Sequence, residues 1–196
     1  MGSSSTQQRI MVPRQQGDPS TLARRMLTYW FQDYQRGQIV PEHCRKKWFI
    51  SHPLLDKYMV YEFGADCETY RKEKLHAAAG PYTQLEKDPV GSLALSILIN
   101  FYPKCLLRLE RAENGGLLTP EMVVTSHFGP TSRLAHEEFL GMVYNAIQML
   151  HPLRYDVIER IFYFLPLLNV QQVNTQKIAS ARFADLLDEA PRIHQP

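Results

Sequence analysis

The feature that most constrains this chain is an apolar run between two prolines, Pro89 and Pro103, which reads PVGSLALSILINFYP. Leucine and alanine outnumber the β-branched residues that favour strands, so the composition predicts a helix. Asp88 can cap it, and Pro89 falls in the first turn, where a missing N–H costs nothing. Pro103 disfavours helical angles at Tyr102 and is expected to end the helix. A helix this apolar must be surrounded by other helices.

The polar residues of this run form a line on one side of the expected helix. Ser92, Ser96 and Asn100 follow one another at intervals of four residues. Asn100 needs hydrogen-bond partners, because a buried amide left unpaired costs about 1–3 kcal/mol. The amide either bonds to a neighbouring helix end or forms the floor of a pocket, with Tyr102 and Lys104 at its mouth and Asn169, Gln171 and Gln172 opposite.

The remaining apolar periodicity also predicts helices. No pair of segments carries the alternation and turn chemistry of a β-hairpin. Residues 1–19 are rich in Ser, Gln and Pro and are expected to form a disordered tail ahead of one helical domain over residues 20–190. The segment after Pro103, up to about residue 130, is expected to be irregular apart from a short helix at Thr119-Pro120. The fold class predicted is all-α, a multi-helix bundle around the buried central helix. The other helices are expected at about 18–36, 41–49, 53–79, 134–150, 153–165 and 170–187. The last of them is expected to bury Val173, Ala181, Ala184 and Leu187.

Composition excludes several classes of function. The net charge of +2 over 196 residues and the absence of a dense basic face argue against nucleic-acid binding. The central apolar run is too short and interrupted for a bilayer span, so no stable membrane insertion is expected. Three cysteines far apart suit reduced thiols in a cytoplasmic protein. No histidine, cysteine or carboxylate spacing is typical of a metal site, and no phosphate-binding loop is present, so no cofactor is expected.

Four segments together resemble the domain of unknown function 924 family: Trp30-Phe31, KKWFISHPLLDKYMVYEFG, DPVGSLALSILINFYP and RIFYFLPL. The resemblance covers about Leu22 to Leu187 and implies an all-helical fold of tetratricopeptide-like hairpins. Relatives carry charged residues after the central helix and an acidic, histidine-bearing run after the later Leu-Pro step. Here those two stretches read NFYPKC and LNVQQ. The resemblance therefore implies a retained scaffold whose charged set has been neutralised.

Two classes of function follow. The first is a cofactor-free small-molecule pocket protein, an isomerase, cyclase or lyase acting on an apolar metabolite, as in specialised metabolism. Asn100, Tyr102 and Lys104 are its candidate catalytic residues, because an amide can orient a carbonyl and the other two can transfer a proton. The second class is a helical scaffold that binds a peptide or protein partner, and a homodimer also stays open. A pocket containing Asn100 favours the first class, and an exposed groove favours the second. The candidate ligand-binding residues are Trp48, Phe101, Arg160, Tyr163, Asn169, Gln171 and Gln172.

Overall fold

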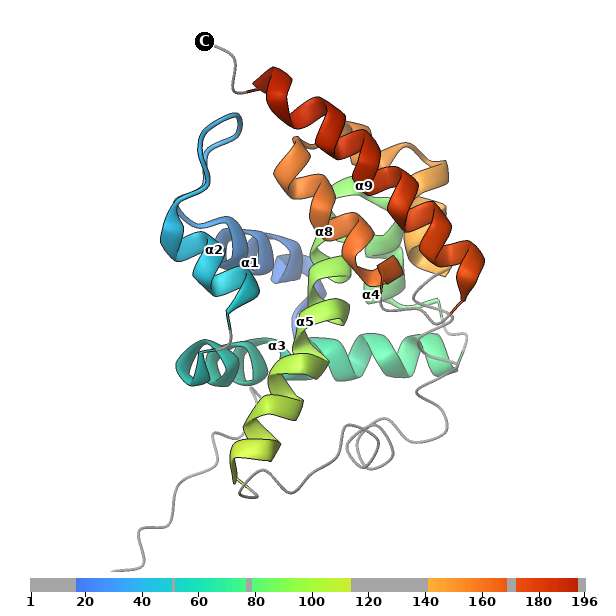
Figure 1. Cartoon of the computed structure of the whole chain (residues 1–196). Helices are drawn as coiled ribbons and strands as arrows, with labels where there is room; N and C mark the ends of the chain where they lie inside the picture. The colour runs from blue at the N-terminus through green and yellow to red at the C-terminus, as the bar shows by residue number, and fades with distance from the viewer. Residues whose placement is uncertain (1–16, 51, 77–78, 114–140, 169–171, 194–196) are drawn as a thin grey trace, which may run out of the picture.

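The computed structural model describes residues 17–50, 52–76, 79–113, 141–168 and 172–193, and these residues form helices and no strand (Figure 1). This confirms the all-α class; the tetratricopeptide-like arrangement of hairpins stays a prediction. Residues 141–148 are also helical. The elements in chain order are α1 (Pro19–Phe31), α2 (Glu42–Phe49), α3 (Pro53–Leu75), α4 (Pro81–Gln84), the 3₁₀ helix η1 (Leu85–Lys87), α5 (Pro89–Glu113), the 3₁₀ helix η3 (His151–Arg154), α8 (Val157–Leu168) and α9 (Val173–Ile193).

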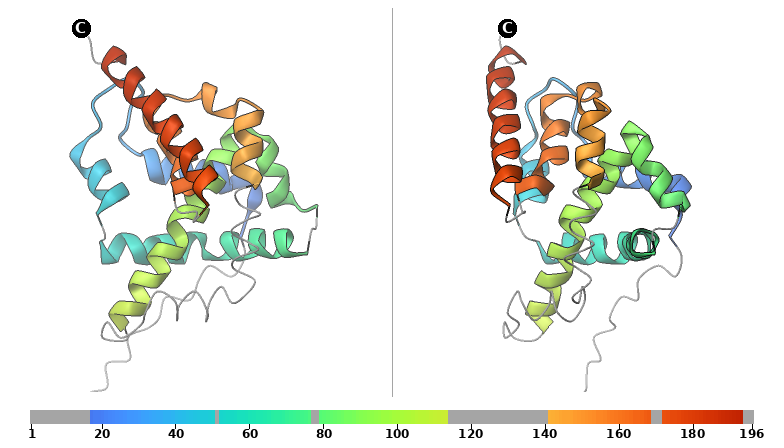
Figure 2. Two further views of the ribbon diagram at one scale, coloured as in Figure 1. Left: turned by 45° about the vertical axis from the view of Figure 1, so that its right-hand side comes forward. Right: turned by 90° about the vertical axis from the view of Figure 1, so that its right-hand side faces the viewer.

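Helix α5 lies at the centre of the described structure. It contacts α1, α3 and α8, and α9 packs on the outer side of α8 (Figure 2). Residues 91–100 are all buried, as a helix apolar on every face requires. Asp88 accepts the backbone N–H of Gly91 at 2.7 Å, so the predicted cap is present. The apolar run therefore occupies the core position that its composition predicts.

The expectation that Pro103 ends this helix is wrong, because α5 continues through Pro103 to Glu113. An interior proline removes one helical hydrogen bond and costs about 3 kcal/mol. Contacts beyond the proline oppose that cost. Cys105 is buried, and the Arg108 guanidinium donates to both carboxylate oxygens of Asp56 on α3. Tertiary contacts therefore hold the last turns of α5 in helical geometry.

Helix α5 is long enough to be compared with a membrane-spanning helix. Its segment Pro89–Leu109 is long and apolar enough to cross a bilayer by length and composition, whereas the expected run ended at Pro103. The absence of stable membrane insertion therefore stays a prediction. In the structure 61% of the most apolar window is buried inside the protein. A buried core helix of a soluble protein has the same length and composition.

The N-terminal region docks earlier than the predicted domain start. The Asp18 side chain caps α1 by accepting the N–H of Ser20 at 3.0 Å, and its own N–H donates to Asp66 on α3 at 3.0 Å. A Cβ at Gly17 would lie 2.2 Å from the hydroxyl of Tyr82, so the chain is already packed at that position. Residues 1–16 of the expected tail lie outside the described residues. Helix α1 ends at Phe31 rather than near residue 36.

The C-terminal helices also depart from expectation. Helix α8 continues past Pro166 to Leu168, and both Pro166 and Leu167 are buried. Helix α9 points a different face inward from the one predicted. Thr175, Ala179 and Leu186 are buried, whereas Val173 and Leu187, which were expected to be buried, are exposed. The predicted helix near Thr119 lies outside the described residues.

Candidate functional site

A cavity of about 240 Å³ lies where α1, α2, α3, α5 and α8 meet. It combines aromatic and aliphatic side chains with three cationic side chains and one carboxylate. Volumes of this order hold a small ring system, since a cavity of roughly 150 Å³ accepts benzene. The residues that line it are Tyr29, Trp30, Lys47, Trp48, Phe49, Ile50, Leu55, Asp56, Met59, Asn100, Phe101, Lys104, Cys105, Arg108 and Leu165.

Four residues expected to form the site are brought together in this cavity. Trp48 comes from α2, and Asn100, Phe101 and Lys104 come from α5. Residues four apart on a helix share a face, which places Asn100 and Lys104 one above the other with Arg108 a further turn along. The helix that continues through Pro103 therefore extends the cavity wall by one turn.

Lys104 is the most exposed cation at this site. Its ammonium group donates to the Oδ1 atom of Asn100 at 3.0 Å and lies 5.5 Å from the ring centre of Phe101. The pKa of Lys104 is lowered, first by burial of its ammonium group and then by the charge of Arg108. Arg108 itself is held by both carboxylate oxygens of Asp56. Lys104 therefore carries a charge that no ion pair offsets among the described residues.

The aromatic wall contains a hydrogen-bond donor without an acceptor. The Trp30 ring lies 4.4 Å from that of Phe101, and the indole N–H of Trp48 donates to the backbone carbonyl of Trp30 at 2.8 Å. The indole N–H of Trp30 is buried and has no acceptor among the described residues. Such a group costs about 1–3 kcal/mol, and its burial leaves the Trp30 ring as an apolar part of the cavity wall.

Lys47 is the second lysine of the cavity. Its ammonium group donates to the backbone carbonyl of Tyr29 and lies 5.0 Å from the centre of the Tyr29 ring. Burial lowers the pKa of Lys47, while the nearby charge of Asp33 acts in the opposite direction. The sequence did not indicate Lys47 or Tyr29 as site residues, because helices far apart in the chain form the cavity that they line. Arg108 was missed because Pro103 was interpreted as a helix end, although Phe101, Cys105 and Arg108 continue the helical spacing.

The other predicted site residues lie elsewhere. Tyr102 is half-buried and does not line this cavity. Tyr163 is buried and its hydroxyl contacts Ser92 and the carbonyl of Pro89, which ties α8 to the start of α5. Burial raises the pKa of Tyr163.

The segment expected to face Asn100 across the cavity contributes little that can be described. Asn169 and Gln171 lie outside the described residues. Gln172 is exposed, and its carbonyl accepts the N–H of Gln176 at the start of α9 at 3.0 Å. In this cavity α8 contributes Leu165, which precedes the expected segment by one turn.

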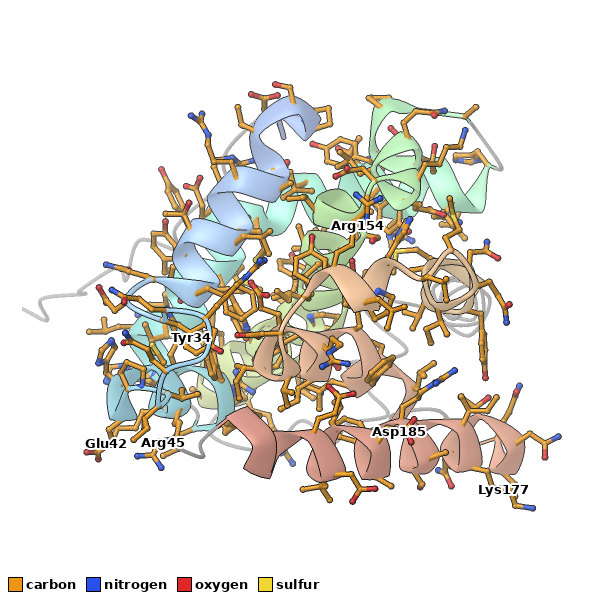
Figure 3. The ribbon with its side chains drawn as sticks, turned by 90° about the horizontal axis from the view of Figure 1, so that it is seen from above. Tyr34, Glu42, Arg45, Arg154, Lys177 and Asp185 are labelled. Carbon is orange, nitrogen blue, oxygen red and sulfur yellow. The ribbon has the colours of Figure 1, made fainter. Side chains whose placement is uncertain are left out.

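Arg160 lines a second cavity of about 320 Å³ between residues 147–153, α8 and α9. Its guanidinium donates to Glu189 on α9, and Arg182 lies 3.6 Å from Asp185 (labelled in Figure 3). These arginines are therefore paired with carboxylates of the same cavity. Asp188 adds a third carboxylate to the lining, so the cations of this cavity are all paired, unlike those of the cavity around Lys104.

The other potentially reactive side chains described below are buried. Ser92 lies 3.2 Å from His151 and 2.8 Å from the hydroxyl of Tyr163, with all three buried in the core. Burial raises the pKa of Cys67 and of Cys105 to about 12, so both thiols stay protonated at neutral pH. No group of three or more His, Cys, Asp or Glu side chains within the described ranges is arranged to hold a metal ion.

Comparison with known proteins found no matching family model, no matching curated protein and no matching solved structure. The resemblance to the domain of unknown function 924 family therefore stays a hypothesis that rests on the four sequence segments.

Proposed function

We propose that this protein binds a small, largely apolar molecule in the cavity around Asn100 and Lys104, without a cofactor. The observation that carries the proposal is a cavity of about 240 Å³ whose lining combines the rings of Trp30, Trp48 and Phe101 with the side chain of Lys104. Apolar cavities with a few convergent polar groups are the usual form of small-molecule sites. Here aromatic rings supply contact area, while Asn100 and Lys104 supply the polar groups.

The shape of the cavity favours a small ligand over a peptide. It is bounded on several sides by α1, α2, α3, α5 and α8, and it holds about 240 Å³. A helical scaffold that binds a peptide needs an extended groove, because an amphipathic helix contacts its groove over several turns. The exposed side chains at the cavity, Phe49, Ile50 and Lys104, leave room for entry from solvent. The peptide-binding scaffold remains the alternative hypothesis.

Binding is tested with an uncharged bicyclic probe, 2-naphthamide, by isothermal titration calorimetry. Leu55 lines the cavity, and its neighbour Leu54 is exposed and does not. Leu55→Trp should fill the cavity and abolish binding, whereas Leu54→Trp should bind as the wild type does. Circular dichroism checks that both variants are folded. Equal affinity in the two variants would refute the proposal, as would failure of the wild type to bind both 2-naphthamide and the carboxylate of the same shape, 2-naphthoate.

As an enzyme, the protein would be an isomerase, cyclase or lyase that uses no cofactor. Lys104 is its proton-transfer group, because partial desolvation of its ammonium group and the charge of Arg108 lower its pKa. Asn100 would orient the reacting carbonyl. Untargeted metabolite profiling of a cell extract incubated with the protein tests this role: a product formed by the wild type should be missing with Lys104→Met. A product that forms equally with both proteins would exclude catalysis by Lys104.

A further inference from the structure

The charges that line the cavity do not balance. Lys47, Lys104 and Arg108 are cationic, and Asp56 is the one carboxylate among the residues that line it. Asp56 is already held by Arg108 in a bidentate pair. Two ammonium groups are therefore left without an ion pair within the described part of the chain. An ammonium group that lies beside the cavity without a carboxylate partner favours a bound anion there.

The two lysines differ in what surrounds them. Lys47 is half-buried, and its ammonium group is engaged by the Tyr29 carbonyl and ring, with the negative charge of Asp33 nearby. Lys104 lies on the exposed side and experiences the positive charge of Arg108. An ammonium group has three N–H donors, of which Lys104 uses one for Asn100. The Lys104 end is therefore the more anion-attracting end of the cavity.

We propose that the cavity selects a small planar aromatic carboxylate, whose carboxylate binds the ammonium group of Lys104 at the mouth and whose ring packs against Trp30, Trp48 and Phe101. This inference rests on the proposed small-molecule function and adds the chemical class of the ligand. Asp56 occupies the Nε and Nη2 donors of Arg108, so we assign the ligand carboxylate to Lys104 rather than to Arg108. The positive charge of Arg108 favours an anion beside Lys104.

The test compares two probes of the same shape, 2-naphthoate and uncharged 2-naphthamide. The wild type should bind the carboxylate roughly tenfold more tightly, as expected for one charge-assisted hydrogen bond. Lys104→Met and Lys104→Gln should weaken the binding of 2-naphthoate more than that of 2-naphthamide, so that the preference for the carboxylate is lost. Lys46→Met is the matched control, since Lys46 is exposed, pairs with Glu42 and does not line the cavity. It should change neither affinity.

Each outcome separates this inference from the function on which it rests. Equal wild-type affinity for both probes would overturn the carboxylate preference while the small-molecule function stands. Loss of the preference in Lys47→Met but not in Lys104→Met would overturn the assignment of the anion to Lys104. If neither probe binds the wild type, the proposed function itself fails. Both tryptophans of the chain line the cavity, so quenching of tryptophan fluorescence gives an independent readout of occupancy.

Discussion

At the scale of single residues, buried polar groups fix how the helices meet. Asp66 on α3 is almost fully buried and accepts from the Arg25 guanidinium, the Tyr82 hydroxyl and the backbone N–H of Asp18. A carboxylate buried to this degree is tolerated only when its oxygens are satisfied. Asp66 thus connects the start of α1 to α3 and α4, and it holds the first described residues against the core.

Asp66→Ala is expected to destabilise the protein by about 3–5 kcal/mol, because it leaves the Arg25 charge and the Tyr82 hydroxyl without their buried partner. Urea denaturation followed by circular dichroism measures the loss. Glu62→Gln is the control, since Glu62 is the second and less buried partner of Arg25 and should cost about 1 kcal/mol or less. Equal losses in the two variants would show that the buried network contributes no more than its peripheral ion pair.

His151 makes the stability of the core depend on pH. Burial lowers the pKa of His151, and the charge of Arg154 acts in the same direction. The unfolded chain therefore takes up this proton at a higher pH than the folded protein does, with an unfolded pKa near 6.5. The contribution of neutral His151 is complete above that value and is lost as the pH falls through it towards the folded pKa.

The free energy of unfolding of the wild type should decrease from about pH 7.5 to about pH 5 more than that of His151→Gln, which has no proton to gain there. Urea midpoints at the two pH values give the comparison. His43 lies on the exposed surface, so His43→Gln should retain the wild-type dependence. A decrease of equal size in all three proteins would assign the effect to other groups.

At the scale of elements, the tertiary structure overrides local propensity at two prolines. Pro103 lies within α5 and Pro166 within α8, and each removes one helical hydrogen bond. The helices continue because buried residues follow each proline, Cys105 in one and Leu167 in the other. The start of α8 is capped by side chains. At the start of α8, Asp156 and Glu159 bond reciprocally to each other's backbone N–H groups.

Replacing Pro103 by alanine should stabilise the protein by about 1–3 kcal/mol, because alanine restores the missing N–H donor and suits a helix interior. Thermal and urea denaturation measure the gain. Pro89→Ala is the control, since Pro89 lies in the first turn of α5 and should give no comparable gain. A loss of stability in Pro103→Ala would mean that the packing contacts of the proline ring outweigh the hydrogen bond that alanine restores.

At the scale of the whole molecule, the described helices surround α5 with contributions from both ends of the chain. Helix α1 packs on one side of α5 and α8 on another, so distant segments share one core (Figures 1 and 2). The hydroxyl of Tyr34, which is labelled in Figure 3, donates to Asp156 and joins the loop after α1 to α8. The cavity depends on the same association of distant segments.

Deletion of residues 1–16 should leave the melting temperature unchanged, because their composition offers little apolar surface to bury. Deletion of residues 1–20 should lower it by several degrees, since it removes the Asp18 cap and the bond from Asp18 to Asp66. Differential scanning calorimetry of both truncated proteins provides the measurement. A large decrease with the shorter deletion would show that the first residues contribute to the fold.

The sequence by itself determined the all-helical class, the buried central helix and its Asp88 cap. It also identified part of the cavity, namely Trp48, Asn100, Phe101 and Lys104. These follow from local information, since composition, periodicity and capping act within a few turns of one helix. Only the tertiary structure decided that α5 passes through Pro103, which face of α9 is buried, and that Trp30 and Lys47 join the cavity. The physical reason is that a local preference of a few kcal/mol is smaller than the packing and ion-pair energy available once distant helices meet.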